Sequence, residues 1–136
     1  MPSDVLSDDA ACTYLFHIGY DAVIRSPIRY GGSMVVIGLG VLGLTTVSAA
    51  TRAGINVYAI SNQTNLKLVA EEFGAKKCFS RNDPLIDEKL DQELIDTVIS
   101  TTNSWKDWRL CLKLVRPRGN IGVIGFPGRG ELPPEN

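Results

Sequence analysis

SMVVIGLGVLGLTTVSAATRAGINVYAISN, residues Ser33 to Asn62, decides the fold of this chain. The stretch reads as a strand, a glycine turn, a helix and a second strand. Met34 to Ile37 is a short apolar run, typical of a strand that is buried on both faces. The helix expected over Val41 to Ala53 is followed by Gly54, in the place that favours a left-handed residue after a helix. Ile55 to Ile60 then reads as the next strand.

The glycine turn has the pattern G-x-G-x-x-G, from Gly38 through Gly40 to Gly43. Between a strand and a helix this pattern indicates a dinucleotide site. The first glycine allows the tight turn, the second lets a pyrophosphate approach the backbone, and the third lets the helix lie close to the sheet. The first N–H groups of the helix and the positive end of its dipole face the same spot. A glycine turn without a ligand is the structural alternative.

The end of the second strand bears on which dinucleotide binds. NAD sites usually carry a carboxylate there, for the adenosine ribose. This chain has Ser61, followed by Asn62 and other polar residues, with no acid before Glu71. These residues favour NADP(H) over NAD, although no arginine follows the strand and Lys67 is the only nearby cation along the sequence. The alternative is that residues 61–65 only cap the next helix.

Composition limits the classes of protein to consider. With 136 residues, 44% of them hydrophobic, and a net charge of −1, the chain suits one domain and gives no electrostatic reason to expect nucleic acid or a membrane surface as a partner. It has no apolar run of roughly 20 residues and no signal-peptide pattern, so we expect a cytoplasmic protein. Three separated cysteines are typical of reduced thiols in a core and argue against a zinc site. His17 has no potential ligand at a suitable spacing, so we assign it no catalytic or metal role.

The other elements alternate along the chain. We expect helices over 8–24, 66–73 and 105–115, a short surface helix within 81–93, and strands over 77–80, 96–100 and 121–124. The last long helix is expected to pack through Trp108, Leu112 and Val115. This alternation predicts an α/β fold, a three-layer doubly wound parallel sheet of about five strands. The predicted organisation is a lead-in over 1–32, a dinucleotide-binding domain over 33–128 and a loose tail over 129–136.

The carboxyl ends of parallel strands share one edge of the sheet, where ligands bind at the point of strand-order reversal. The glycine turn, residues 61–65, residues 101–104 and residues 125–128 should therefore meet there. We expect the first two to hold the pyrophosphate and the adenosine ribose, and the others to hold the nicotinamide half. The candidate cofactor-binding residues are Gly38, Gly40, Val41, Leu42, Gly43, Ser61, Asn62, Thr101, Gly125 and Phe126.

Several segments, in their order and spacing, resemble the cofactor-binding domain of the medium-chain dehydrogenase/reductase superfamily, the zinc-type alcohol dehydrogenases and quinone reductases. They are PSDVLSDDAA, GYDAV, VVIGLGVLGLTTVSAATRAGINVYAIS, EEFGA, DTVIS and LKLVRPRGNIGVIGFPG. The segment at Ser61 and the later SRND are similar to the NADPH-dependent branch around the cinnamyl alcohol dehydrogenases. The resemblance implies NADP or NAD as cofactor, with Leu42 and Ser61 on cofactor positions and Gly125 and Phe126 on the nicotinamide side.

The resemblance also shows departures. Superfamily members carry an N-terminal catalytic domain, and their sheet continues into a sixth strand; we expect both to be missing here. We therefore assign no catalytic residue and expect the isolated chain to be inactive. The two functional hypotheses are the cofactor domain of a dehydrogenase and a stand-alone dinucleotide-binding or interaction module; a folded remnant that binds nothing is a third. A sheet edge left open after residue 124 predicts a homodimer.

Overall fold

A parallel sheet of five strands lies at the centre of the structure, a computed structural model that describes residues 3–126. The predicted domain boundary at residue 128 and the predicted tail over 129–136 lie outside the described residues. The order across the sheet is β3-β2-β1-β4-β5. The strands are β1 (Ser33–Ile37), β2 (Asn56–Ile60), β3 (Lys77–Phe79), β4 (Thr97–Ser100) and β5 (Asn120–Val123).

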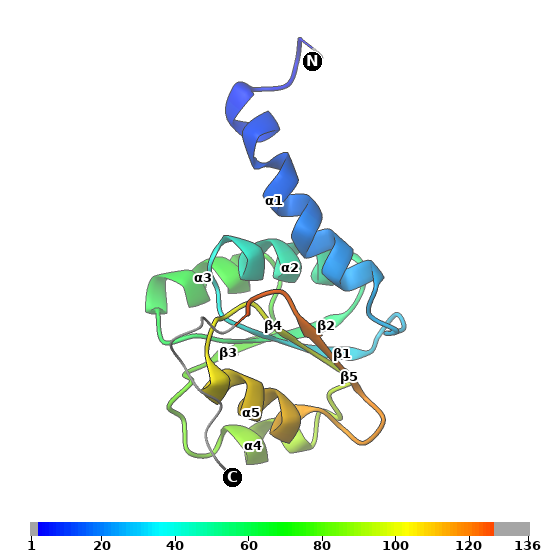
Figure 1. Cartoon of the computed structure of the whole chain (residues 1–136), viewed down its shortest axis with the longest axis vertical. Helices are drawn as coiled ribbons and strands as arrows, with labels where there is room; N and C mark the ends of the chain where they lie inside the picture. Colours follow the sequence, from blue (N-terminus) through cyan, green and yellow to red (C-terminus); the bar gives the residue numbers. More distant parts are fainter. Residues whose placement is uncertain (1–2, 127–136) are drawn as a thin grey trace.

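Helices cover both faces of the sheet, as Figure 1 shows. One face carries α1 (Ser7–Ile24), α2 (Val41–Arg52) and α3 (Thr64–Glu72), and the other carries α4 (Ile86–Asp91) and α5 (Trp105–Leu114). The predicted three-layer doubly wound α/β fold is therefore confirmed. Each of the predicted strands and long helices begins and ends within two residues of its expected bounds.

Strand β1 explains why the core has two halves. All five of its residues are buried, and their side chains alternate between the two faces. Met34 and Val36 pack with the cluster that includes Val47 of α2, whereas Val35 and Ile37 pack with the cluster that includes Cys111 of α5. An apolar run without polar alternation is what a strand covered on both faces requires.

Two packing predictions were wrong in detail. In α5 the buried residues are Asp107, Cys111 and Leu114, whereas Leu112 is 69% exposed. The expected core thiols are found only in part, since Cys111 is buried but Cys12 is exposed on α1.

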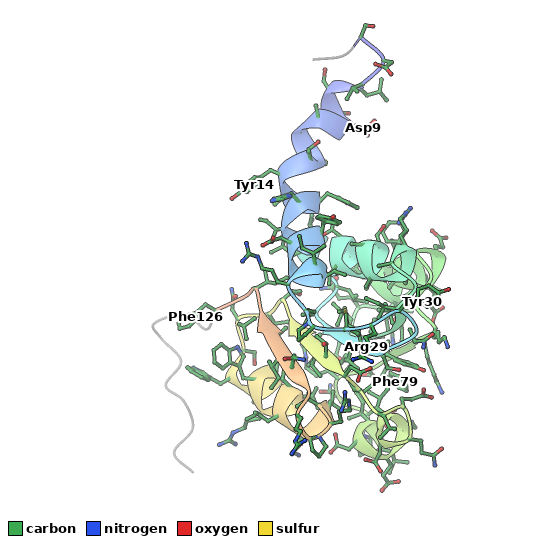
Figure 2. All side chains as sticks on the ribbon, turned by 90° about the vertical axis from the view of Figure 1, so that its right-hand side faces the viewer. Asp9, Tyr14, Arg29, Tyr30, Phe79 and Phe126 are labelled. Atoms are coloured by element: carbon green, nitrogen blue, oxygen red, sulfur yellow. The ribbon has the colours of Figure 1, made fainter. Side chains whose placement is uncertain are left out.

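Helix α1 extends well beyond the body of the domain (Figure 1), and Tyr14 points away from the other elements (Figure 2). Only Gly19 and Val23 of this helix are buried. At Gly19 the helix lies directly on α2, where an added Cβ would be 2.7 Å from the backbone nitrogen of Thr46. No helix within residues 3–126 has both the length and the apolar character needed to cross a bilayer.

Candidate functional site

A hollow of about 340 Å³ lies where β1, β2, β3 and β4 reach their carboxyl ends. Gly38 follows β1, Ser61 follows β2, Arg81 follows β3 and Thr101 follows β4, and all four line the hollow. The strand order reverses between β1 and β4, which is where ligands bind in open α/β sheets. The predicted meeting of the glycine turn with residues 61–62 and 101 is observed.

The three glycines of the turn differ in what the fold requires of them. Gly38 has a φ of +90°, which L side chains rarely adopt, and its N–H donates to the carbonyl of Ile60 over 2.9 Å. An added Cβ at Gly43 would overlap the carbonyl oxygen of Gly38, so the third glycine allows a close backbone approach. Gly40 has an ordinary φ of −69°, and an added Cβ there would meet nothing within 4 Å. The backbone therefore does not require glycine at position 40, and the space in front of it is open to a ligand.

Helix α2 presents donors to this space. Its first internal hydrogen bond runs from the N–H of Leu44 to the carbonyl of Gly40 over 2.9 Å. The N–H groups of Val41, Leu42 and Gly43 precede that bond and have no carbonyl of the helix to pair with. No side chain caps the helix at Gly40. The site thus combines free amide donors with the positive end of a helix dipole, an arrangement suited to a phosphate.

Thr101 holds the glycine turn from the second half of the chain. Its N–H donates to the carbonyl of Ile37 over 3.0 Å, and its hydroxyl lies 3.1 Å from the carbonyls of both Ile37 and Gly38. The hydroxyl hydrogen is thus directed at the turn, so Thr101 positions the turn in addition to lining the hollow.

The loop after β2 is fastened to the loop after β3. Ser61 is buried, and its Oγ accepts a hydrogen bond from the N–H of Gln63 over 3.1 Å. Oδ1 of Asn62 accepts hydrogen bonds from the hydroxyl of Ser80, over 3.0 Å, and from the N–H of Arg81, over 2.9 Å. The N-cap of helix α3, Gln63, makes no side-chain capping hydrogen bond, and the alternative that residues 61–65 only cap this helix stays an alternative prediction.

Arg81 is a cation beside the site; it lies in the SRND segment but is not among the cofactor-binding residues that the sequence predicts. Lys67, the nearby cation along the sequence, does not line the hollow. Nε of Arg81 lies 2.8 Å from Oδ1 of Asp107, and the hydroxyl of Thr102 donates to Oδ2 of Asp107 over 2.6 Å. The residues that line the hollow include an arginine and no carboxylate. The sequence contained a partial signal, because Arg81 follows directly on the strand expected over 77–80, but the pairing of that strand with β2 is seen only in the structure.

The profile of the family described as zinc-binding dehydrogenase matches residues 41–136. The chain belongs to the zinc-binding dehydrogenase family. The resemblance to the medium-chain dehydrogenase/reductase superfamily is thereby confirmed.

Curated relatives agree with this family. The NADP-dependent isopropanol dehydrogenase of Entamoeba histolytica is 23% identical over 137 residues, which cover 96% of this chain and 37% of the relative. The sorbitol dehydrogenase of Bacillus subtilis is 25% identical over 138 residues, which cover 98% of this chain and 39% of the relative. The chain therefore spans less than half the length of these relatives.

A solved structure shows the same fold. The alcohol dehydrogenase TADH from Thermus sp. ATN1 superposes with a TM-score of 0.87 at 22% identity, covering 96% of this chain and 40% of that one.

Three predicted site residues of this zinc-binding dehydrogenase family member do not line the hollow: Gly43, Gly125 and Phe126. Gly125 is buried, and an added Cβ there would lie 2.7 Å from the carbonyl carbon of Thr102, so it supports the loop after β4. Phe126 is 72% exposed (Figure 2), with its ring centroid 5.9 Å from that of Trp108. Their assignment to the nicotinamide side stays a prediction.

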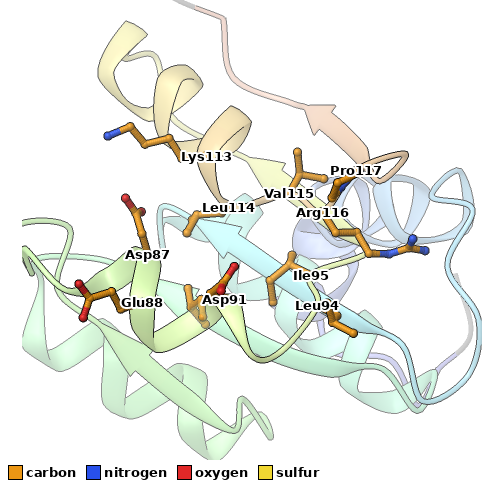
Figure 3. A pocket seen from close by; sticks show the side chains of 11 residues that line it. Asp87, Glu88, Asp91, Leu94, Ile95, Lys113, Leu114, Val115, Arg116 and Pro117 are labelled. Carbon is orange, nitrogen blue, oxygen red and sulfur yellow. The ribbon is translucent and has the colours of Figure 1, made fainter.

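A second hollow, of about 380 Å³, lies between α4 and α5 (Figure 3). Its lining includes Ile95, just before β4, and Arg116 and Pro117, just before β5, so it lies toward the amino ends of the strands. It has no glycine turn, and the first turn of α4, which lines it, carries the acidic side chains of Asp87 and Glu88, so this hollow lacks the features that suit a phosphate. Within residues 3–126, no three His, Cys, Asp or Glu side chains are grouped so that they could hold a metal ion.

Proposed function

We propose that the chain binds NADP(H) in the hollow at the glycine turn, as the cofactor-binding part of an alcohol dehydrogenase-like oxidoreductase. The observation that carries this proposal is the open space at Gly40, directly in front of the unpaired amides of α2 and at the reversal of strand order. The glycine turn would hold the pyrophosphate through Gly40, Val41 and Leu42. Ser61 and Asn62 would lie at the adenosine ribose.

The lining of the hollow supports NADP(H) over NAD(H). A carboxylate at the end of β2 would pair with the ribose hydroxyls of NAD and repel a 2′-phosphate. The hollow has Ser61 at that position and Arg81 on the neighbouring loop, with no acid in its lining. The Entamoeba histolytica relative is an NADP-dependent enzyme by name.

The bound cofactor would supply a hydride donor or acceptor, whereas the residues described here bind and orient it. We assign no residue of this chain to the activation of an alcohol. Since the chain spans 37% of its Entamoeba histolytica relative, we propose that turnover depends on a catalytic domain of the kind that complete dehydrogenases of this superfamily carry.

Calorimetric titration of the purified chain with NADPH and NADH tests the proposal. We expect NADPH to bind with micromolar affinity and NADH more weakly. Gly40→Ala should weaken NADPH binding at least tenfold by filling the space at the turn, and Gly40→Asp should abolish binding by adding a negative charge as well.

The midpoint of thermal unfolding of Gly40→Ala should stay near that of the wild type, because the new Cβ meets no neighbouring atom. That of Gly40→Asp should not fall, because an aspartate at this N-cap can accept a hydrogen bond from the first turn of α2. Leu112→Ala, at an exposed position of α5, is the matched control. Failure of the wild type to bind either dinucleotide would overturn the proposal.

A further inference from the structure

We infer that Arg81 is the residue that recognises the 2′-phosphate of the dinucleotide, and that Asp107 is the positioning residue that holds it. This assignment rests on the proposed function and names the group that would give the site its preference for NADP(H). Arg81 lies 20 residues beyond Ser61 in the sequence, but both line the same hollow.

The first step of the argument is the place of Arg81 relative to the end of β2. The N–H of Arg81 donates to Oδ1 of Asn62 over 2.9 Å, and the hydroxyl of Ser80 donates to the same oxygen. The two loops are therefore joined at the point where the ribose is expected. Arg81, on the loop after β3, is thus held beside Ser61, which occupies the position where NAD sites usually carry a carboxylate.

The second step concerns the guanidinium. The contact with Asp107 is made at Nε, which lies 2.8 Å from Oδ1 of Asp107, and the two terminal amino groups of the guanidinium carry four further N–H donors. The Asp107 side chain is 1% exposed and that of Arg81 is 34% exposed. A solute in the hollow therefore reaches the guanidinium and not the carboxylate behind it. Planar amino groups of this kind match the oxygens of a phosphate.

The third step is the support for Asp107. Its Oδ2 accepts a hydrogen bond from the hydroxyl of Thr102 over 2.6 Å, and Thr102 also lines the hollow. A buried carboxylate on α5 thus joins the loop after β3 to the loop after β4. Thr102 and Arg81 explain why the charged side chain of Asp107 can be buried, since an unpaired charge in this position would be costly.

The experiment compares the affinities of the full chain for NADPH and NADH, and for 2′,5′-ADP and 5′-AMP as fragments with and without the 2′-phosphate. We expect Arg81→Gln to weaken NADPH and 2′,5′-ADP at least tenfold and to change NADH and 5′-AMP less than twofold. Arg81→Lys should keep part of the preference. Asp107→Asn should lower the preference while Arg81 is still present.

Lys67→Gln is the matched control, because it removes a nearby cation that does not line the hollow. Thermal unfolding of each variant shows whether it is folded. If Arg81→Gln weakened the binding of NADPH and NADH equally, the assignment of Arg81 would be overturned but the proposed function would stand. The same would follow if Lys67→Gln lost the preference for NADPH over NADH. Failure of the wild type to bind any of the four compounds would overturn the proposed function, and this assignment with it.

Discussion

At the residue scale, Asp96 joins the amino ends of three strands. Its Oδ2 accepts a hydrogen bond from the N–H of Ser33 over 3.0 Å, its Oδ1 accepts one from Nε of Arg116 over 2.7 Å, and its carbonyl accepts one from the N–H of Asn120 over 2.8 Å. Burial on its own would raise the pKa of Asp96. The hydrogen bonds from Ser33 and Arg116, together with the charge of Arg116, outweigh burial and hold this pKa below its ordinary value of 3.8.

This lowered pKa predicts how stability depends on pH. The folded chain binds the Asp96 proton less tightly than the unfolded chain, so the stabilisation is complete well above pH 3.8. It is lost as the pH falls through the lower pKa of the folded state. We expect Asp96→Asn to lower the free energy of unfolding by about 1–2 kcal/mol at pH 7 and by less at pH 3. Urea unfolding at both pH values measures this difference, and an equal loss at both would contradict the assignment.

Some residues of the site could be predicted from the sequence, and others could not. Gly38 and Gly40 could be placed because the pattern G-x-G-x-x-G has a backbone meaning that depends little on the rest of the chain. Arg81 could not be placed, because only the pairing of β2 with β3 brings it beside Ser61. Asp107 was missed because charged residues are rarely buried, and its partners come from two other loops.

At the scale of elements, the contact of α1 with α2 depends on one small residue. Gly19 is buried against Thr45 and Thr46, with no room for a methyl group. Glycine within a helix costs about 1 kcal/mol relative to alanine, so an exposed Gly→Ala change would stabilise the helix. At Gly19 the steric overlap should outweigh this gain, since overpacking costs about 1–3 kcal/mol.

We therefore predict that Gly19→Ala lowers the free energy of unfolding, as measured by urea titration. Thr13→Ala, at an exposed position of the same helix, is the control and should change stability by less than about 1 kcal/mol. A Gly19→Ala variant as stable as the wild type would mean that α1 shifts on α2 without cost.

Elements were the most predictable level of this structure. Apolar runs such as Met34 to Ile37, and the glycines that separate such runs, predict the ends of the strands and long helices to within two residues. The buried face of α5 was predicted wrongly because that helix buries Asp107 and exposes Leu112. A pattern of apolar residues cannot show that a charged residue has partners on other loops.

At the scale of the whole molecule, the strand order leaves β5 at an edge of the sheet described here. Ile121 and Val123 of this strand are 37% and 43% exposed, and a groove lined by Ile18 and Ala22 of α1 runs along it. Unpaired backbone groups beside apolar side chains favour pairing with another strand. The predicted homodimer is consistent with this edge and stays a prediction.

Sedimentation equilibrium of the wild type and of Val123→Lys tests this prediction. We expect the wild type to self-associate and the lysine to weaken association at least tenfold, because a charge on an edge strand opposes pairing. Leu112→Lys is the control: it adds the same charge at an exposed position of helix α5, away from the strand edge, and should leave association unchanged. A monomeric wild type at high concentration would exclude pairing through β5.

The glycine turn and its support come from parts of the chain that are far apart, since Thr101 holds the carbonyl of Ile37 from 64 residues away. A ligand that fills the hollow contacts both parts at once, so its binding energy opposes separation of the two halves of the sheet. At a concentration one hundred times its dissociation constant, such a ligand adds about 2.7 kcal/mol to the stability of the native state. The supply of cofactor would then set how long the protein survives proteolysis in the cell, apart from any reaction in which the cofactor takes part.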